Sequence, residues 1–437
     1  YESFLDPNNA ADAGADQDGD GLSNLTEYKQ GLSLVLADTD ADGFTDFQER
    51  PIADGGTGTH PKNPDTDGDT LKDGLEAADG GNPLDVDTDD DFYWDGHEKK
   101  AGSQLNNAAS VPNGLVVTSL GTGAGVLLLS DLTDPNNDIN DTTPEGTGFD
   151  WVGISSSSPA NFAVEAAGNV FDNKVGAGEA KWCCNPAPQN VTVEFASYTS
   201  LQYFTITSSN DSPERDPRVW QIQGSNDGIN FAPIAVFDFT GAALWTQRNQ
   251  VLRINLPTRS LPYKFIRYQV YSTGSATQHA LGEIEYFGLQ SNVDADGDGM
   301  PKLFEDLYPT FLSDTPGSPA DRDADFDGDG LSNVREFDNG TKPDVADTDG
   351  DLLVDGLEVD EYFSNPFVKD TDGDGLEDGP EHLTYHTDPI MVDSDGDFFK
   401  DGYEVAAGSD PASDTSTPFG VTVGFPGNGT GALLGGD

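Results

Sequence analysis

The stretch DTDGDGLEDGPEHLTYHTDP, from Asp370 to Pro389, carries the pattern that decides the fold of this chain. Asp fills positions 1, 3 and 5 of a twelve-residue loop, and Glu fills position 12. Three closely spaced carboxylates repel one another unless a cation neutralises them, and the Glu can return to bind that cation through both oxygens. The pattern therefore predicts a metal site within the loop.

Hard oxygen donors fill every ligand position of this loop. Magnesium prefers a tighter octahedron and zinc or copper prefers His or Cys, so a shell of about seven oxygens indicates calcium. We expect about one calcium ion per loop. The expected donors are the carboxylates of Asp370, Asp372 and Asp374, the backbone carbonyl of Leu376, Asp378 directly or through water, and both oxygens of Glu381.

The same template occurs nine times in the chain. Position 9 is Asp in six loops, Asn24 and Asn333 in two, and Lys302 in one, so the Lys302 loop is the weakest candidate. Chance acidity would not place Glu at position 12 every time, which argues against a merely solvated or disordered acidic run. The predicted ligands, with the position 7 carbonyl included, are Asp16, Asp18, Asp20, Leu22 and Glu27; Asp38, Asp40, Asp42, Phe44, Asp46 and Glu49; Asp65, Asp67, Asp69, Leu71, Asp73 and Glu76; Asp87, Asp89, Asp91, Tyr93, Asp95 and Glu98; Asp294, Asp296, Asp298, Met300 and Glu305; Asp325, Asp327, Asp329, Leu331 and Glu336; Asp347, Asp349, Asp351, Leu353, Asp355 and Glu358; Asp370, Asp372, Asp374, Leu376, Asp378 and Glu381; and Asp393, Asp395, Asp397, Phe399, Asp401 and Glu404.

The spacing of the loops predicts a solenoid. Loop starts lie 22 to 31 residues apart, mostly 22 or 23. The roughly ten residues left between loops leave no room for the two flanking helices of a helix-loop-helix calcium hand. Each unit also has only one or two apolar residues, such as Leu22 or Phe399, so the metal has to replace a hydrophobic core.

Units such as Asp370 to Pro389, with the trailing Thr-Asp-Pro turn, resemble bacterial thrombospondin type 3 repeats. The resemblance covers roughly residues 12 to 103 and 292 to 414. It implies an extracellular, calcium-ordered stalk with little secondary structure.

The net charge of the chain is consistent with a calcium-binding stalk. It has 79 acidic and 21 basic residues and a formal net charge of −58. Four carboxylates in each of nine loops give 36 predicted ligands, and six more stand at position 9, so just over half of the 79 acidic residues are predicted ligands. Nine calcium ions would cancel 18 charges, so the loaded protein stays anionic and we expect no nucleic acid or anionic lipid as a partner.

The calcium concentration that the loops need indicates where the protein is located. Millimolar calcium outside cells fills loops of modest affinity, so we expect an extracellular or cell-surface protein. No 18-residue apolar run is present, so we expect no membrane span, and Tyr1 in place of Met implies processing or truncation. Possible N-glycosylation sites are Asn140, Asn190, Asn210, Asn339 and Asn428, with Asn24 expected to serve its loop instead.

The composition changes between the two acidic arrays. From about Val111 to Leu289 short alternating runs of β-branched and aromatic residues predict antiparallel strands packed as a β-sandwich. The fold class is therefore mainly β plus irregular structure, with calcium-stapled ladders flanking the sandwich. The predicted domains are a ladder of four loops at 1–103, the sandwich at 104–290, a ladder of five loops at 291–414, and a β-strand tail at 415–437.

The central region resembles a discoidin or coagulation-factor-type C domain, a galactose-binding-like jelly roll. The stretches that carry the resemblance are SSPANFAVEAAGNVFDNKVGAGEAKW at 157–182, RVWQIQGSNDGINFAPIA at 218–235, KFIRYQVYSTG at 264–274 and GEIEYFG at 282–288. By position, the resemblance implies that Asp172 and Glu283 hold that family's structural calcium. The insert from Lys174 to Trp182 departs from the family pattern.

Sugar binding by this domain would need aromatic faces and fixed polar groups in its loops. Trp182, Trp245, Arg215 and Arg218 are the candidates. The alternative is that Trp182 and Trp220 belong to the core.

Cys183 and Cys184 are the only cysteines. They could form a vicinal disulfide, pair with other chains or stay reduced, and we favour the disulfide because an oxidising exterior is expected. His382 and His386 follow a calcium loop and do not resemble a zinc-protease helix. No catalytic set of residues stands out, so we expect no enzyme.

A longer repeat organises the whole chain. Asp16 and Asp38 correspond to Asp325 and Asp347 at an offset of 309, and the loops starting at 65 and 87 correspond to those at 370 and 393 at offsets of 305 and 306. Residues 419–434 then correspond to the opening strands around 115–129, so they predict a strand that pairs with another sheet.

We expect either an excised part of a tandem array or head-to-tail assembly into a stalk or filament. The alternative function is a carbohydrate-binding adhesin with the sandwich as its head.

Overall fold

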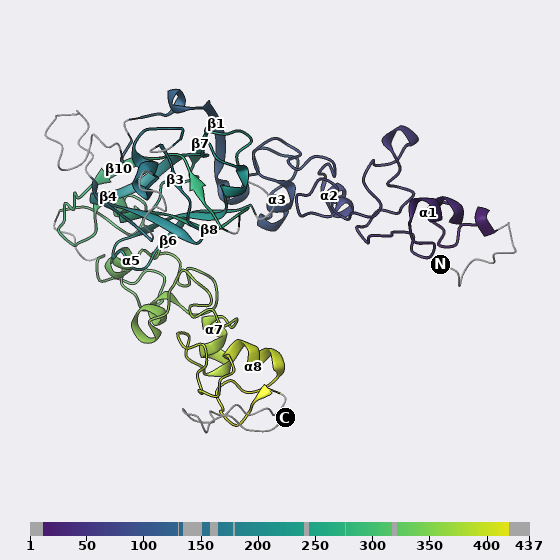
Figure 1. The fold of residues 1–437 in the computed structure, drawn as a ribbon. Helices are drawn as coiled ribbons and strands as arrows, with labels where there is room; N and C mark the ends of the chain where they lie inside the picture. Colours follow the sequence, from purple (N-terminus) through teal and green to yellow (C-terminus); the bar gives the residue numbers. More distant parts are fainter. Residues whose placement is uncertain are drawn as a thin grey trace, which may run out of the picture.

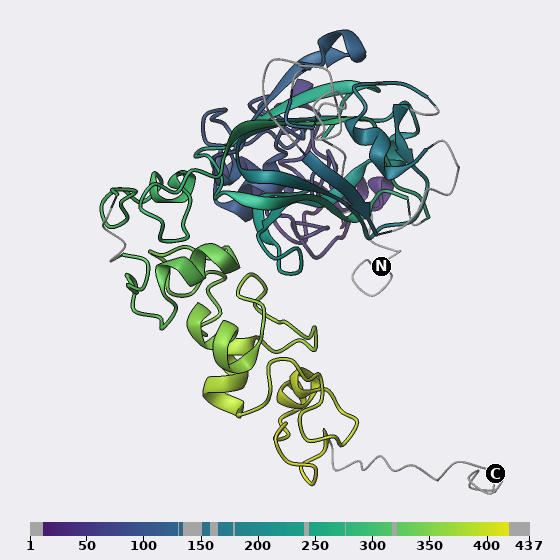
Figure 2. The same ribbon diagram turned by 90° about the vertical axis from the view of Figure 1, so that its left-hand side faces the viewer.

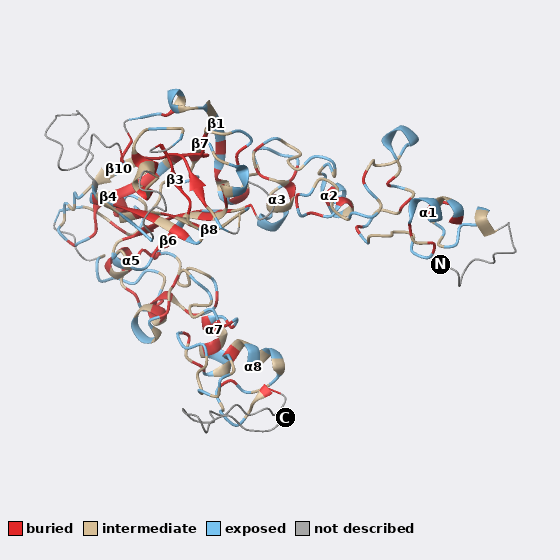
Figure 3. Cartoon of the chain, in the orientation of Figure 1, coloured by how far each residue is buried: buried red, intermediate tan, exposed pale blue. Residues whose placement is uncertain are grey.

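The computed structural model describes residues 12–129, 131–133, 151–157, 165–177, 180–239, 244–275, 277–316 and 321–418. A central β-sandwich carries two ladders of loops, which leave it in different directions (Figures 1 and 2). Buried residues gather in the sandwich and form only small groups along the ladders (Figure 3). The predicted tail strand at 419–434, together with Asn140 and Asn428, lies outside the described residues.

All strand pairs of the sandwich are antiparallel. The main sheet has the order β1-β7-β4-β8-β5-β6, and β2 and β10 also pair with β4. A short pair, β3 with β9, lies apart from it. The strands are β1 (Val116–Thr122), β2 (Trp151–Ser156), β3 (Trp182–Cys183), β4 (Gln189–Thr207), β5 (Pro217–Ser225), β6 (Ala232–Asp238), β7 (Gln250–Asn255), β8 (Tyr263–Thr273), β9 (Ala280–Leu281) and β10 (Ile284–Ser291).

Strand β4 joins the two layers of the sandwich. Its first half pairs with β8 and β2, its second half pairs with β7 and β10, and the register breaks between Glu194 and Thr199. One 19-residue strand that changes partners midway curls the sheet on itself. The predicted mainly β fold is therefore confirmed.

The core between the layers is aromatic. Trp220 stacks on Phe237 with ring centroids 4.1 Å apart and meets Phe204 edge on. Trp182 and Trp245 are buried as well, at 1% and 5% exposure. Burial of three tryptophans supplies much of the hydrophobic stabilisation that the ladders lack.

Each ladder unit contains one loop and, in most units, one short helix. Each helix begins at position 9, and the Glu at position 12 lies in its first turn or, after the three-residue helices α6 and α7, begins the turn that follows. The α-helices are α1 (Asn24–Gln30), α2 (Asp73–Asp79), α3 (Asp95–Ala101), α4 (Lys302–Glu305), α5 (Asn333–Asn339), α6 (Asp355–Leu357), α7 (Asp378–Pro380) and α8 (Asp401–Ala407), and short 3-10 turns lie at Asp12–Gly14, Ile52–Asp54, Pro112–Gly114, Ala124–Val126, Ala167–Phe171 and Pro213–Arg215.

Two units contain a π-helical turn. Helix α6 continues as Glu358–Tyr362 and helix α7 as Glu381–Tyr385, both with π geometry. These two units are the ones whose next loop starts 23 rather than 22 residues on. Since a π turn absorbs one extra residue, it restores the stacking that the longer spacing would otherwise disturb.

Successive units are joined by a recurring hydrogen bond. The second carboxylate oxygen of the Asp at loop position 5 accepts the backbone N–H of position 10 in the next unit, as in Gly379 N to Asp351 Oδ2 at 2.8 Å. The same bond joins Phe47 to Asp20, Gly96 to Asp69, Gly356 to Asp329 and Gly402 to Asp374. Among the described residues it is present at every junction with 22 or 23 residue spacing and at neither of the two longer ones.

Candidate functional site: the calcium ladders

Backbone amides shape each loop before any ion binds. In the Asp370 loop the N–H groups of Gly373 and Gly375 donate to the two oxygens of Asp370 at 2.8 and 3.0 Å. The N–H of Leu376 donates to Asp374 Oδ1 at 2.7 Å. These bonds hold the side chains of positions 1 and 5, and the chain folds tightly around them.

The carboxylates of one loop converge. One oxygen from each of Asp65, Asp67 and Asp69 lies within 4.8 Å of the other two, and the equivalent triplets starting at Asp16 and Asp38 do the same. Like charges this close need a cation among them. In these three loops the structure brings positions 1, 3 and 5 together.

The Glu at position 12 is buried in every loop. Exposure of these side chains does not exceed 2%. In seven of them both carboxylate oxygens lack a hydrogen-bond partner among the described residues. In Glu358 and Glu381 one oxygen accepts from Ser364 or Thr387, and the other has no partner. A buried carboxylate without a partner is costly, so these oxygens fit a bound cation. The seven are Glu27, Glu49, Glu76, Glu98, Glu305, Glu336 and Glu404.

Burial and neighbouring acids raise the pKa of these glutamates. Burial first, and then the charges of Asp67 and Asp69, raise the pKa of Glu76 to about 9. Glu336 and Glu358 reach about 9 for the same reasons, and Glu27 and Glu404 reach about 7. The raised pKa favours the protonated form of these glutamates in the absence of an ion, so binding of a cation to them is coupled to proton release.

The Asp at position 9 lies between two loops. Asp73 accepts the N–H and the hydroxyl of Thr66, at position 2 of its own loop, at 2.8 and 2.6 Å. It also lies with Asp42 and Glu49 of the preceding loop in one group of ligand oxygens within 4.8 Å of one another. The sequence predicted Asp73 as a ligand of its own loop, and the structure places it beside the preceding site too.

Positions 2 and 9 vary together. Every loop with Asp at position 9 has Thr or Ser at position 2. Where position 9 is Asn, position 2 is Gln17 or Phe326, and the amide of Asn24 or Asn333 donates to a backbone carbonyl upstream of the loop. In these two loops a hydrogen bond from the Asn side chain to a backbone carbonyl therefore takes the place of the hydrogen bond between the position 2 hydroxyl and the position 9 Asp.

The Lys302 loop is completed by residues that sequence reasoning missed. Lys302 turns outward and pairs with Asp306 at 2.5 Å. Asp314 Oδ1 accepts the N–H of Ala295, the bond that position 9 accepts elsewhere. Burial raises the pKa of Glu305 to about 8, and the charges of Asp314 and Asp321 are among the further causes. The 31-residue spacing after this loop was the available signal.

Each ladder ends in a partial unit without acid ligands. The N–H of Asn82 donates to Thr88 at position 2 of the next loop, at 2.7 Å. The same contact recurs between Gln104 and Ser110 and between Asp410 and Ser416, at 3.0 and 2.9 Å. Since residues 104–110 and 410–416 keep the turn of a unit but lack its ligands, they cap the ladders.

A second acidic group lies in the sandwich. Glu283 is 1% exposed and its Oε1 accepts the N–H of Asn173 at 2.8 Å, while Oε2 has no partner among the described residues. Burial raises its pKa well above the usual value, and the charges of Asp172 and Asp131 raise it further. The predicted pair is thus close together. Asp131, which is buried, was missed because it precedes a stretch with no motif.

Lys174 places a positive charge beside Asp172, where a cation site would not need one. Its ammonium lies 2.9 Å from Asp172 Oδ2, so the insert supplies a positive charge of its own. The fit of Asp172 and Glu283 to calcium is therefore weaker than that of the ladder loops, whose carboxylates have no such counter-charge.

The predicted sugar-binding residues do not form an open site. Trp182 packs edge on against His279 at 4.8 Å, and Trp245 donates to the carbonyl of Ile206 at 3.4 Å. Their faces are buried, so neither is free to stack on a sugar. Trp182 and Trp220 belong to the core, as the alternative interpretation of the sequence held, and Trp245 is not available as a sugar-binding candidate. Arg218 is half-buried, and Arg215 is occupied by the contacts described next.

Cys183 and Cys184 form the vicinal disulfide favoured from the sequence. Arg215 Nη1 lies 3.8 and 3.7 Å from the two sulfurs and 3.3 Å from Asp211 Oδ2. Lys181, at 5% exposure, lies 2.7 Å from the same carboxylate. These ion pairs hold the loop against the sandwich.

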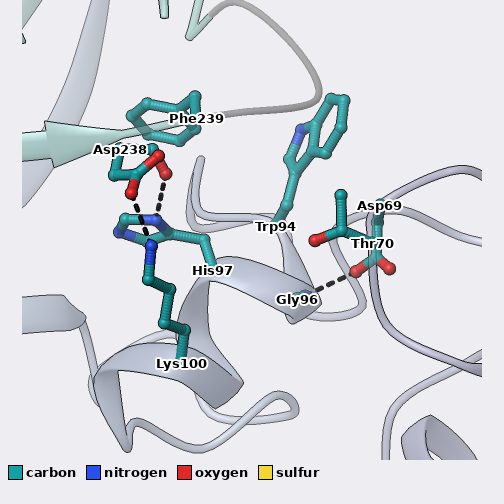
Figure 4. A pocket seen from close by; sticks show the side chains of 8 residues that line it. All are labelled: Asp69, Thr70, Trp94, Gly96, His97, Lys100, Asp238 and Phe239. Atoms are coloured by element: carbon teal, nitrogen blue, oxygen red, sulfur yellow. Dashed lines mark hydrogen bonds and ion pairs between the residues drawn. The ribbon is translucent and has the colours of Figure 1, made fainter. Parts of the chain in front are cut away.

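The first ladder is fixed to the sandwich by the helix that carries its last ligands. Figure 4 shows His97 and Lys100 of α3 directed at Asp238, with Phe239 above the imidazole. His97 Nδ1 lies 2.5 Å from the Asp238 carbonyl, and its ring stacks on Phe239 at 5.1 Å. Tyr93, at position 7 of the same loop, is buried in the sandwich core. Metal binding and domain attachment therefore share one element.

Together these features define a calcium-binding repeat protein that carries an antiparallel β-sandwich domain. A family model described as Bacterial TSP3 repeat matches residues 65–86, 370–391 and 393–413. The predicted resemblance of the acidic units to bacterial thrombospondin type 3 repeats is thereby confirmed. No helix within the described ranges is long and apolar enough to cross a membrane.

Among solved structures the chain is similar to several sugar-binding domains. One is CpGH89CBM32-5 from Clostridium perfringens, in complex with GalNAc-β-1,3-galactose, at 14% identity over 31% of this chain and 94% of that chain, with a TM-score of 0.26. Another is chitosan-binding module 1 of a Paenibacillus chitosanase/glucanase, at 20% identity over 31% and 94%, with a TM-score of 0.25. A third is a fucolectin from striped bass, Morone saxatilis, at 16% identity over 33% and 50%, with a TM-score of 0.27. A search of curated proteins finds no match.

Proposed function

We propose that this protein is an extracellular structural protein whose calcium-ordered ladders serve as rigid stalks. The observation that carries the proposal is the burial of all nine position 12 glutamates, each with at least one oxygen that has no partner among the described residues. A cation at each loop satisfies those oxygens and replaces the missing core. The loop residues named above are the ligands, with Asp314 and Asp321 added at the Lys302 loop.

Sharing of Asp73 between adjacent sites makes the ladders stiff. An ion held by Asp42, Glu49 and Asp73 ties two units through one centre. In a linear repeat, stability is a sum of unit and interface contributions, so such ties propagate order along the stalk. A rod of this kind holds domains apart, and the same residues give no support for catalysis, so we propose no enzymatic role.

Head-to-tail assembly is the further part of this proposal. The tail at 419–434 corresponds to the region of β1, and β1 is an edge strand whose pairing is with β7 alone among the described strands. An edge strand of this type is readily supplied by another chain. The tail contains no charged residue, whereas the chain carries a net charge of −58.

Truncation tests the assembly. We expect the full chain in millimolar calcium to form filaments or oligomers, visible by electron microscopy and analytical ultracentrifugation. The chain lacking residues 415–437 should stay monomeric with unchanged thermal stability. Filaments from the truncated chain, or monomers from the full chain, would contradict assembly through the tail.

The competing function is carbohydrate binding by the sandwich. The burial of Trp182 and Trp245 removes the aromatic faces expected for it. A different surface, between the sandwich and the second ladder, supports this function better.

A further inference from the structure

A groove of about 530 Å³ lies where the second ladder meets the sandwich. The sandwich contributes the start of β6, the β7–β8 connection and Tyr263. The ladder contributes Leu307, Tyr308, Gly340, Lys342, Asp344, Thr348 and Phe367. This volume falls within the range of sites that bind small ligands, roughly 300–1,000 Å³. It lies near α5, at the junction seen in Figure 1.

The floor of the groove depends on a glycine. Gly340 ends helix α5 with a positive φ of 85°. A Cβ there would lie 3.2 Å from the Tyr263 ring and 3.8 Å from the Phe367 ring. The absence of a side chain at Gly340 therefore lets the ladder lie close to Tyr263 of the sandwich and to Phe367.

Two cations line the groove without a counter-ion. The side chains of Arg259, half-buried, and Lys342, exposed, make no hydrogen bond or ion pair with any described residue. Asp344 is the acid among the lining residues. Two free cations in one groove stand out in a chain with 21 basic against 79 acidic residues. They favour an anionic ligand, because free cations near apolar walls attract negative charge strongly.

Aromatic and hydroxyl groups add to this selection. Tyr308 and Phe367 are only partly buried and line the groove beside Thr258. Ser260 and Thr348 line it as well, but their hydroxyls already donate to the Leu261 carbonyl and to Asp355. Partly exposed aromatic rings beside a hydroxyl suit sugar rings, which present C–H groups on one face and hydroxyls at the edge. An extended acidic peptide would use the cations but gains little from the rings.

We propose that this groove binds an acidic oligosaccharide, with Arg259 and Lys342 on its carboxylate or sulfate groups and Phe367 and Tyr308 against its rings. The site is separate from the loops around Cys183 and Trp245. It needs a folded second ladder because Tyr308, Lys342 and Phe367 come from ladder units. It does not depend on head-to-tail assembly.

Binding is measured by titration calorimetry on the full chain in 2 mM calcium. The probes are the hexasaccharides of hyaluronan and of chondroitin sulfate, the carboxyl-reduced hyaluronan hexasaccharide, and a poly-glutamate peptide of equal charge. We expect at least one acidic hexasaccharide to bind and the carboxyl-reduced one and the peptide to bind about tenfold more weakly or not at all. Calcium removal should abolish binding.

Matched variants distinguish binding in the groove from non-specific attraction to the positive charges of the ladder. Arg259→Gln with Lys342→Gln, and Phe367→Ala separately, should each weaken binding about tenfold, whereas Arg322→Gln, an exposed cation of the same ladder outside the groove, should not. Protease resistance in calcium shows whether the ladder of each variant is folded, which separates loss of this site from loss of the stalk. The proposal is overturned if neither acidic hexasaccharide binds, if the peptide or the uncharged sugar binds equally well, or if the double variant binds unchanged.

Discussion

At the scale of single residues, the ladder is a set of buried acids that no protein group satisfies. Glu381 has no measurable exposure, and the one neighbour that donates to it is Thr387, at 3.0 Å. Its pKa is raised to about 8, first by burial and then, against the Thr387 bond, by Asp372 and Asp374. Such a residue stabilises the fold only when it binds a cation.

Glu381→Gln should therefore weaken the Asp370 loop. The amide keeps the size but loses the charge and the second oxygen donor, so calcium affinity at that site should fall at least about tenfold, which is about 1.4 kcal/mol. Calcium titration calorimetry measures it, and an unchanged number and affinity of sites would exclude Glu381 as a ligand. Glu377→Gln, in the same loop at a non-ligand position, is the matched control.

Acidity should have opposite effects on the calcium-free and calcium-loaded ladders. Glu76 and Glu336 have an ordinary pKa of 4.5 and reach about 9 in the fold, so folding favours their protonated forms. Stability from this source is complete below about pH 4.5 and is lost as the pH rises towards 9. We expect calcium-free protein to resist proteolysis better at pH 5 than at pH 8, and calcium-loaded protein to do the reverse. Equal resistance of the calcium-free form at both pH values would contradict this prediction.

At the scale of elements, each ladder unit consists of a loop and a helical turn, and each unit supplies groups that complete the site of the unit before it. The position 10 amide of one unit satisfies position 5 of the unit before it, and position 9 lies beside the site before it. A π turn corrects the two longer spacings. Local sequence fixes the loop, but the site is complete only across a junction.

Gly402→Ala tests that junction. A Cβ at Gly402 would lie 2.8 to 2.9 Å from backbone atoms of Asp374, Gly375 and Leu376 in the preceding unit. Although Ala favours a helix, we expect the clash to cost about 1–3 kcal/mol and to weaken calcium binding in the Asp370 loop as well as its own. Tyr403→Ala, on the same helix and half-exposed, is the control and should leave the Asp370 loop unchanged. Thermal unfolding at fixed calcium, with hydrogen exchange of both loops, measures the effect.

At the scale of the whole molecule, two kinds of stability are joined in one chain. The sandwich buries a continuous core, whereas the ladders have scattered buried side chains such as Leu32 and Leu353. One small hydrophobic cluster lies at the start of the second ladder and consists of Met300, Phe304, Leu312, Val334 and Phe337. The junctions link them, through His97 and Lys100 on one side and through Phe337, whose carbonyl accepts from Asn226 at 2.7 Å, on the other.

Removal of calcium by a chelator should unfold the ladders and leave the sandwich folded. Without calcium we expect rapid proteolysis within 12–103 and 292–414, while a central fragment persists because its core needs no metal. Mass spectrometry of the fragments identifies the boundaries. Uniform resistance of the ladders in chelator, or cleavage that begins in the sandwich, would show that calcium does not hold the stalks.

The sequence by itself determined the positions of the sites. Metal ligands at fixed spacing within twelve residues are a local property, so loops, cation type, ladder and strand-rich centre could be predicted from the chain. The sequence also placed Asp172 and Glu283 near each other by resemblance.

Only the tertiary structure decided how the sites are completed and what remains exposed. Asp314 and Asp321 approach Glu305 from a long connection, and Asp73 lies beside Asp42, because stacking brings separate units together. The same packing buried Trp182 and Trp245 and opened a groove beside Gly340. Contacts between distant segments depend on how whole elements pack, and no local pattern of residues encodes that packing.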